Sequence, residues 1–153
     1  MTRIVFSLPY ALVLPNRRGI SSNRHAGAGK VRKERERMAW DIASVLAGFR
    51  PAAPLKYVRV QVFRHSKGEP DTDNLVSSCK PLLDVLQPAG DRRLYGLGII
   101  ENDKPSRCEL RVFDMPLKQR ENPFTRVVIT EIDAKTIAAA RRQALEEAQR
   151  AAA

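Results

Sequence analysis

Two short acidic clusters are the part of this chain whose residue types and spacing suit metal chemistry. Asp71 and Asp73 stand one residue apart directly after Pro70, and Glu101 and Asp103 follow further along in "GLGIIENDKP". Carboxylate oxygens are the ligands that hard divalent cations such as Mg²⁺ take in proteins. The two clusters are therefore candidates for a shared metal site.

The first cluster also has a purely structural interpretation. It lies where a strand-like segment gives way to an apolar-striped, helix-like one, which is where helix caps occur. In that interpretation Asp73 caps the helix by accepting a backbone N–H, and Asp71 is a turn residue. The pair alone favours this interpretation, but a second acidic cluster in a loop bounded by Gly and Pro favours a site.

The charge of the chain indicates a polyanionic partner. Lysine and arginine number 27 against 17 acidic residues, which gives a net charge of +10. A basic surface attracts phosphates, and carboxylates can hold the cation that cleaves a phosphodiester, so the combination suits a nuclease. The basic run from Arg17 to Arg37 contains only Glu34 and Glu36 as acids, and it is either a solvated helix face or a contact to the DNA backbone. We predict the DNA contact, through Arg17, Arg18, Arg24, Lys30, Arg32 and Lys33.

Apolar periodicity predicts the elements that position these residues. Strands are expected at 3–9, 55–64, 107–113 and 124–132, helices at 31–48 and 75–86, and a loop at 10–30. The second helix would present Leu75, Cys79, Leu82 and Leu86 on one face. The order indicates the α+β class, with one small mixed sheet, helices packed on it and a C-terminal helical extension. Residues 1–133 are expected to form one domain, and residues 134–153 an Ala-rich helical tail.

The remaining features indicate a protein of the cytoplasm with no membrane partner. No apolar stretch approaches the length of a bilayer span, and the start has no signal-peptide pattern. Cys79 and Cys108 lie far apart without metal-ligand spacing, so they are expected to be reduced, buried thiols. We assign Trp40 and Phe49 to the core or to a dimer contact.

Several segments together resemble the RusA family of Holliday-junction resolvases of bacteria and their prophages. The segments are "DTDNL", "KPLLDVL", "GIIEND" and "VVITEI", and they lie within residues 3–132. Asp71, Asp73 and Asn74 match the family's Asp-x-Asp-Asn-Leu element. Lys80 and the residues of "LLDVL" match the lysine and helix that follow it, and each element is weak alone but specific in combination.

The resemblance implies a RusA-like fold and a homodimeric crossover junction endodeoxyribonuclease, nucleoid-associated in the cytoplasm. It would bind branched DNA, in particular four-way junctions, and cut two strands symmetrically in DNA recombination and repair. It would use Mg²⁺, with Mn²⁺ as a substitute. The implied residues are Asp71, Asp73 and Asp103 as metal ligands, Lys80 as catalytic lysine, and Asn74, Glu101 and Asn102 beside them.

Two departures from the family pattern keep alternatives open. Asn102 stands where the family usually has an aspartate, and Ser77 stands at the usual lysine position, with Lys80 one helical turn later. Because Pro81 fits the first turn of a helix better than its interior, we expect Leu75–Cys79 to form a looser turn that brings Lys80 back toward the aspartates. One alternative is a catalytically weak or inactive structure-specific DNA-binding protein on the same scaffold. Another is a nuclease for other branched or flapped DNA.

Overall fold

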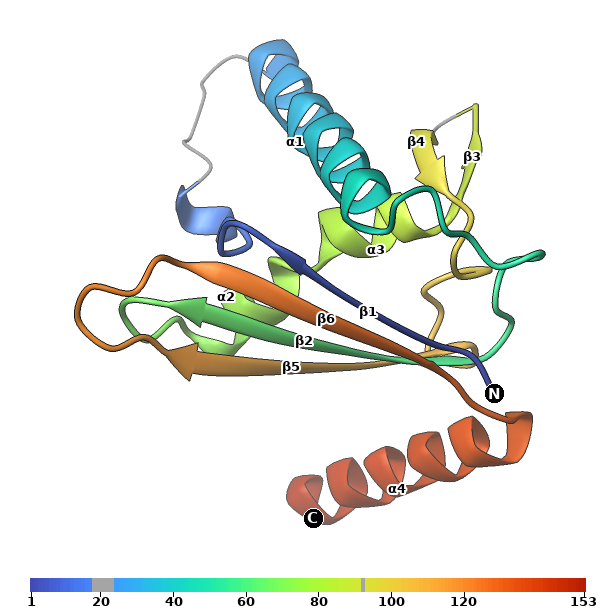
Figure 1. The fold of residues 1–153 in the computed structure, drawn as a ribbon. Helices are drawn as coiled ribbons and strands as arrows, with labels where there is room; N and C mark the ends of the chain where they lie inside the picture. Colours follow the sequence, from blue (N-terminus) through green and yellow to red (C-terminus); the bar gives the residue numbers. More distant parts are fainter. Residues whose placement is uncertain (18–23, 92) are drawn as a thin grey trace.

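The helices of this protein gather mainly on one side of a four-stranded mixed sheet, which confirms the α+β class (Figure 1). The computed structural model describes residues 1–17, 24–91 and 93–153, with side chains at 1–16, 29–91 and 94–153. The elements in chain order are β1 (Arg3–Leu8), the 3₁₀ turn η1 (Pro15–Arg17), α1 (Arg24–Val45), β2 (Val58–Ser66), α2 (Thr72–Ser77), α3 (Lys80–Leu86), β3 (Pro88–Gly90), β4 (Arg93–Leu97), β5 (Cys108–Pro116), β6 (Phe124–Glu131) and α4 (Ala134–Ala152).

The main sheet has the strand order β1-β6-β2-β5. β6 pairs antiparallel with both β1 and β2, whereas β5 runs parallel to β2 along one edge. The residues of β2 alternate between the two faces of the sheet, as expected for a half-buried strand. Val58, Val60 and Val62 are buried, and Arg59 and Gln61 point to the other face. The predicted strands 107–113 and 124–132 are present as β5 and β6, but β2 lies between them.

The core lies between the sheet and the helices α1 and α3. Met38 and Ile42 of α1 are fully buried, and so are Leu82 and Leu86 of α3. Burial of a side chain of this size contributes roughly 1.5–3 kcal/mol, so these residues fix α1 and α3 against the sheet. This packing places the start of α3, which carries Lys80, close to α1.

The long loop predicted at 10–30 is wrong in its second half, because α1 begins at Arg24. This first stretch of α1 carries Gly27 and Gly29 and lacks an apolar stripe, so its sequence does not indicate a helix. Extending a helix that has already formed costs much less than starting one, and the packed segment around Met38 supplies the start. The predicted end is correct: Gly48 has φ +78° and donates its N–H to the Ala43 carbonyl.

The predicted helix over 75–86 consists of two helices, α2 and α3, which meet at Ser78 and Cys79. Pro81 lies in the first turn of α3, where the missing N–H removes no helical hydrogen bond. The four predicted apolar residues are all buried, so the expected face exists although it belongs to two helices. The looser turn expected over Leu75–Cys79 is wrong for Leu75–Ser77, which belong to α2, and the break is confined to Ser78 and Cys79, after which Lys80 begins the new helix.

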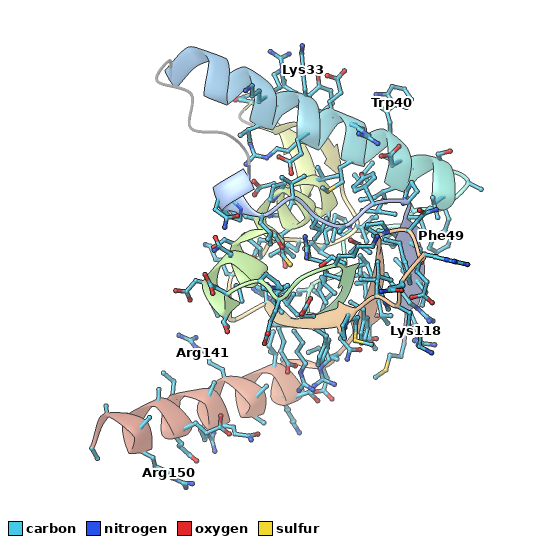
Figure 2. All side chains as sticks on the ribbon, turned by 90° about the vertical axis from the view of Figure 1, so that its left-hand side faces the viewer. Lys33, Trp40, Phe49, Lys118, Arg141 and Arg150 are labelled. Carbon is cyan, nitrogen blue, oxygen red and sulfur yellow. The ribbon has the colours of Figure 1, made fainter. Side chains whose placement is uncertain are left out.

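A short ribbon and two aromatic side chains differ from what the sequence predicted. β3 and β4 form a small antiparallel ribbon in a stretch for which no strand was predicted. Trp40 and Phe49 are 71% and 53% exposed, so their assignment to the core is wrong, and Trp40 points away from the sheet (Figure 2). None of the described helices is long and apolar enough to cross a membrane.

Candidate functional site

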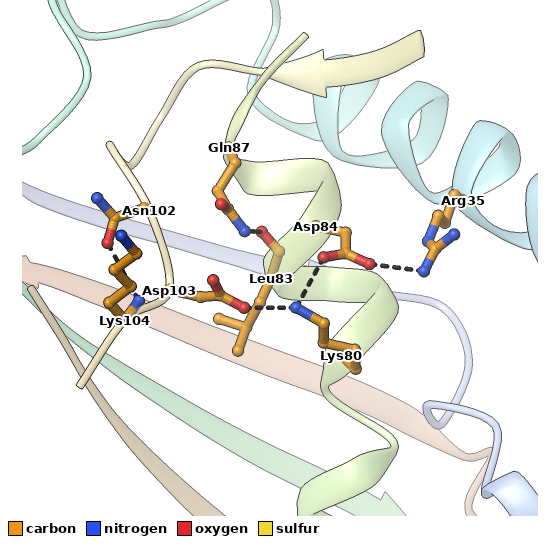
Figure 3. Close-up of polar contacts among 8 residues, drawn as sticks. All are labelled: Arg35, Lys80, Leu83, Asp84, Gln87, Asn102, Asp103 and Lys104. Atoms are coloured by element: carbon orange, nitrogen blue, oxygen red, sulfur yellow. Dashed lines mark hydrogen bonds and ion pairs between the residues drawn. The ribbon is translucent and has the colours of Figure 1, made fainter. Parts of the chain in front are cut away.

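Lys80 contacts the second of the two predicted acidic clusters. The Nζ of Lys80, at the start of α3, donates a hydrogen bond of 2.6 Å to Oδ2 of Asp103, in the loop between β4 and β5 (Figure 3). The two residues lie 23 positions apart in the sequence. The side chain at the later lysine position therefore reaches the second acidic segment, whereas Ser77 is exposed on α2.

Asp84 extends this contact toward α1. Its side chain is buried, with Oδ1 at 3.0 Å from Nζ of Lys80 and Oδ2 at 2.6 Å from Nη2 of Arg35. A continuous chain of charges thus runs from Arg35 through Asp84 and Lys80 to Asp103 (Figure 3). We call these four residues the charge chain.

Sequence reasoning assigned no role to Asp84 or Arg35. The spacing of four residues between Lys80 and Asp84 could have indicated their ion pair, because side chains at that separation are neighbours on a helix. The contact of Asp84 with Arg35 spans 49 positions and had no signal in the sequence.

The environment keeps Lys80 cationic. Partial burial alone lowers the pKa of its ammonium group, but hydrogen bonds and charge attraction from Asp103 and Asp84 outweigh burial, and the net shift is upward. At neutral pH this side chain is thus a positive charge and a hydrogen-bond donor, and it is unsuited to act as a general base.

Asp71 and Asp73 lie at the start of α2, and both are exposed. The N-cap residue is Asp71, without a side-chain capping bond, and Asp73 lies inside the first turn, so the predicted cap role of Asp73 is wrong. Asp71 and Asn74 line a small cleft of about 120 Å³. The other residues of this cleft are Leu14, Asn16, Arg64, Lys67, Gly68, Glu69 and Pro70.

The three aspartates do not meet as one metal site. Within the described residues, which include Asp71, Asp73 and Asp103, no three His, Cys, Asp or Glu side chains are grouped so as to hold a metal ion. Asp103 is instead engaged by Lys80. The acids predicted to bind Mg²⁺ thus lie in two places, Asp71 and Asp73 at the start of α2 and Asp103 beside Lys80.

Asn102 and Glu101, predicted to lie beside the metal-binding aspartates, make contacts within the loop that carries Asp103. Oδ1 of Asn102 accepts the N–H of Lys104 at 3.1 Å, a local turn that sets the course of the loop after Asp103. Glu101 has Oε2 at 3.9 Å from Nη1 of Arg107. These contacts orient the acidic loop, and Asn102 contributes to it without a charge.

Of the predicted DNA-contact residues, the structure describes the side chains of Lys30, Arg32 and Lys33. Arg32 lines a cleft of about 410 Å³ beside the charge chain, together with Arg35, Lys80, Asp84, Val85, Leu94 and Tyr95. Lys30 and Lys33 are exposed on α1, and Lys33 points away from the sheet (Figure 2). Arg18 and the side chains of Arg17 and Arg24 lie outside the described residues.

The cleft beside the charge chain has the composition of an anion site. Among the described lining residues, three cations, Arg32, Arg35 and Lys80, face one carboxylate, that of Asp84. Lys80 is also paired with Asp103, which lies outside this lining, so the described charges still leave a positive excess. Such an excess of positive charge suits a phosphate group, which guanidinium groups bind through paired hydrogen bonds.

No known family model matches the chain, and no curated protein matches it with significant similarity. By its fold, the chain is a small α+β protein, and it has a charged cleft between α1 and α3.

Proposed function

We propose that this protein is a Mg²⁺-dependent endonuclease of the RusA type that resolves four-way DNA junctions, acting as a homodimer. The single observation that carries the proposal is the contact of Lys80 with Asp103. It joins two of the four segments on which the family resemblance rests, "KPLLDVL" and "GIIEND", through the lysine and one of the acids that the resemblance implies. The basic cleft beside them suits a DNA phosphate.

In this proposal Lys80 stabilises negative charge on the phosphate undergoing cleavage. Its raised pKa suits that role, because the ammonium group stays charged throughout the neutral range. Removal of one such preorganised donor typically costs about 10²–10³ in rate. Asp84 and Arg35 would hold Lys80 in place and do not need to touch the DNA.

One observation favours a second candidate, a structure-specific DNA-binding protein with weak or no activity. The predicted metal-binding aspartates are not grouped in the described chain, and Lys80 is neutralised by two carboxylates. A protein of this kind would use the same basic surface to bind junctions without cutting them.

A synthetic four-way junction, incubated with the full-length protein with and without Mg²⁺, separates the two candidates. Paired symmetric nicks that appear only with Mg²⁺ are expected for the resolvase. Tight binding without product would support the binding protein, and equal cutting of linear duplex would support a general nuclease.

Four variants test the residue assignments in the same assay. Asp71→Asn and Asp73→Asn are expected to abolish cleavage while keeping junction binding, because each removes a negative charge near phosphates. Lys80→Ala is expected to lower the rate about 10²–10³-fold, and Ser77→Ala to leave it unchanged. Asp91→Asn, an exposed aspartate of the β3–β4 turn, is the matched control. Wild-type cleavage by Asp71→Asn or by Lys80→Ala would show that the site is misassigned.

A further inference from the structure

The face of the main sheet opposite α1 and α3 is not covered by a described helix. In Figure 1 no helix crosses in front of these strands, and α4 lies beyond the β5 edge. Every second residue of each strand lies on this face: Arg3, Val5 and Ser7 in β1, Arg59, Gln61, Phe63 and His65 in β2, Glu109, Arg111, Phe113 and Met115 in β5, and Phe124, Arg126, Val128 and Thr130 in β6. Of these residues, Val128 is itself buried. All-parallel sheets usually have both faces covered, whereas a sheet with antiparallel pairs such as this one can leave one face to solvent. The residue types on this face therefore indicate what it could bind.

Four aromatic side chains gather at one end of this face. The rings of Phe63 and Phe113 stack with centroids 4.9 Å apart and 13° between their planes. The rings of His65 and Phe124 stack at 3.9 Å and 10°. We call these four residues the aromatic platform. Phe113 is on an edge strand and is 38% exposed, so the stack ends at a ring that another flat group can reach.

The spacing of the aromatic platform suits more than one base. Its two ring pairs are anchored at Phe63 and His65, two residues apart on β2, and that separation is about 6.6–6.8 Å along a strand. Unstacked bases of a single strand can therefore meet the two pairs in turn. Base stacking on aromatic rings tolerates any sequence, because every base has a flat face.

One arginine adjoins the aromatic platform, and others lie farther along the same face. Arg126 is the register partner of Phe63 on β6, and Arg3 and Arg111 lie further along the same face. Of the outward-facing residues in these strands, all of which the structure describes, Glu109 is the one acid. Glu109 is already paired, at 2.8 Å with Arg59 and at 2.6 Å with Arg111. The face therefore carries net positive charge.

This charge distinguishes between two possible occupants of the face. A second copy of the chain would bring its own arginines against Arg3 and Arg126, which is unfavourable without acids to receive them. A polyanion with flat, stackable groups is complementary to both the charge and the rings. Duplex DNA has the charge but keeps its bases stacked inside, so it cannot use the rings.

We propose that the aromatic platform and Arg126 bind single-stranded DNA, with bases stacked on Phe113 and on the His65–Phe124 pair and a phosphate at Arg126. This surface is separate from the charge chain. The inference does not rest on the nuclease assignment and goes beyond it. In a protein acting on branched DNA, such a surface would hold the unpaired segment of a junction arm.

Fluorescence anisotropy of labelled oligo-dT with the full-length protein tests the proposal. Oligo-dT is expected to bind more tightly than a duplex of equal length. Phe113→Leu, which keeps an apolar side chain but removes the ring, is expected to weaken binding about tenfold. Arg126→Gln is expected to reduce the dependence of log K on log salt by about 0.7. Phe49→Leu removes an exposed ring outside the sheet and is the matched control.

Three outcomes would overturn the proposal. One is unchanged oligo-dT affinity of Phe113→Leu in a protein with wild-type circular dichroism. Another is a loss of affinity in Phe49→Leu equal to that in Phe113→Leu, because the effect would then not belong to this face. The third is a lower mass of Phe113→Leu in light scattering, which would make the face a contact between copies. Junction cleavage, measured in parallel on each variant, reports on the nuclease proposal independently.

Discussion

At the scale of single residues, Asp84 is the side chain on which the charged cleft depends most. A carboxylate that is only 8% exposed is costly unless partners compensate for its lost hydration, and Arg35 and Lys80 both do so. Removing the charge of Asp84 would leave two cations near each other with no anion between them. The expected consequence is a loss of stability and also a displaced Lys80.

Asp84→Asn is therefore expected to lower the free energy of unfolding by about 2 kcal/mol, because hydrogen bonds to charged partners contribute about 1.5–3 kcal/mol. Urea denaturation at neutral pH measures the change. Asp91→Asn replaces an exposed aspartate and is expected to change the stability by less than about 0.5 kcal/mol. Equal stability of the two variants would contradict the role given to Asp84.

The site was predictable from the sequence only in part. The family resemblance implied Lys80 and the second acidic cluster indicated Asp103, and the structure places Nζ of Lys80 2.6 Å from Oδ2 of Asp103. The partnership of Arg35 with Asp84 was not predictable, because it depends on how α1 packs against α3. The distances among Asp71, Asp73 and Asp103 depend on the path of two loops, which residue spacing does not determine.

At the scale of elements, α4 is attached to the rest of the protein by a small apolar contact. Asp133 caps its start, with Oδ1 accepting the N–H of Thr136 at 2.6 Å, and Ile137 is its one buried side chain in the described structure. Ile137 lies with Leu83, Cys108 and other residues in the groove beside the β5 edge. The attachment of α4 is therefore concentrated in its first turns.

Two matched substitutions test whether the attachment of α4 is concentrated in its first turns. Ile137→Ala is expected to cost about 2–5 kcal/mol, because it leaves a cavity at a residue that is 4% exposed. Leu145→Ala, at a residue that is 55% exposed, is expected to cost less than about 0.5 kcal/mol. Urea denaturation compares the two variants, and a cost at Leu145 as large as that at Ile137 would show that the second half of α4 is also packed.

Elements with clear periodicity were predicted well, and elements formed by packing were not. β2 alternates strictly and was correctly predicted. The ribbon of β3 and β4 pairs Pro88 with Leu97 and Gly90 with Arg93, and such short segments have too few residues to show a period. The first turns of α1 are helical because the helix continues from its packed part, which local residue types do not indicate.

At the scale of the whole molecule, the buried cysteine thiols and Tyr10 make the free energy of unfolding depend on pH in the alkaline range. Burial raises the pKa of the Cys79 thiol to about 11 and that of the Cys108 thiol to about 12, both from 9.0. Burial and a hydrogen bond to Asp41 also raise the pKa of Tyr10. The folded protein therefore holds these protons at pH values where the unfolded chain releases them.

The free energy of unfolding is accordingly expected to fall as the pH rises above about 9, and to keep falling up to about pH 11–12, where the folded thiols ionise. Below pH 9 both states keep the thiol protons, so this contribution is fully present. Urea denaturation at several pH values measures the slope. Cys108→Ala is expected to make the slope shallower, and a slope identical to that of wild type would contradict the shift assigned to Cys108.

The position of β6 determines when the protein can fold during its synthesis. β6 joins the first strand, β1, to β2, with Arg3 opposite Thr130 and Val60 opposite Ile129. A nascent chain that ends before Phe124 contains β1 but lacks the strand that links it to the sheet. Contacts between residues so distant in sequence form slowly, because a long loop must close first. The apolar side of β1 thus stays exposed until Phe124–Glu131 has left the ribosome, so we expect chaperone dependence to be greatest before that stage.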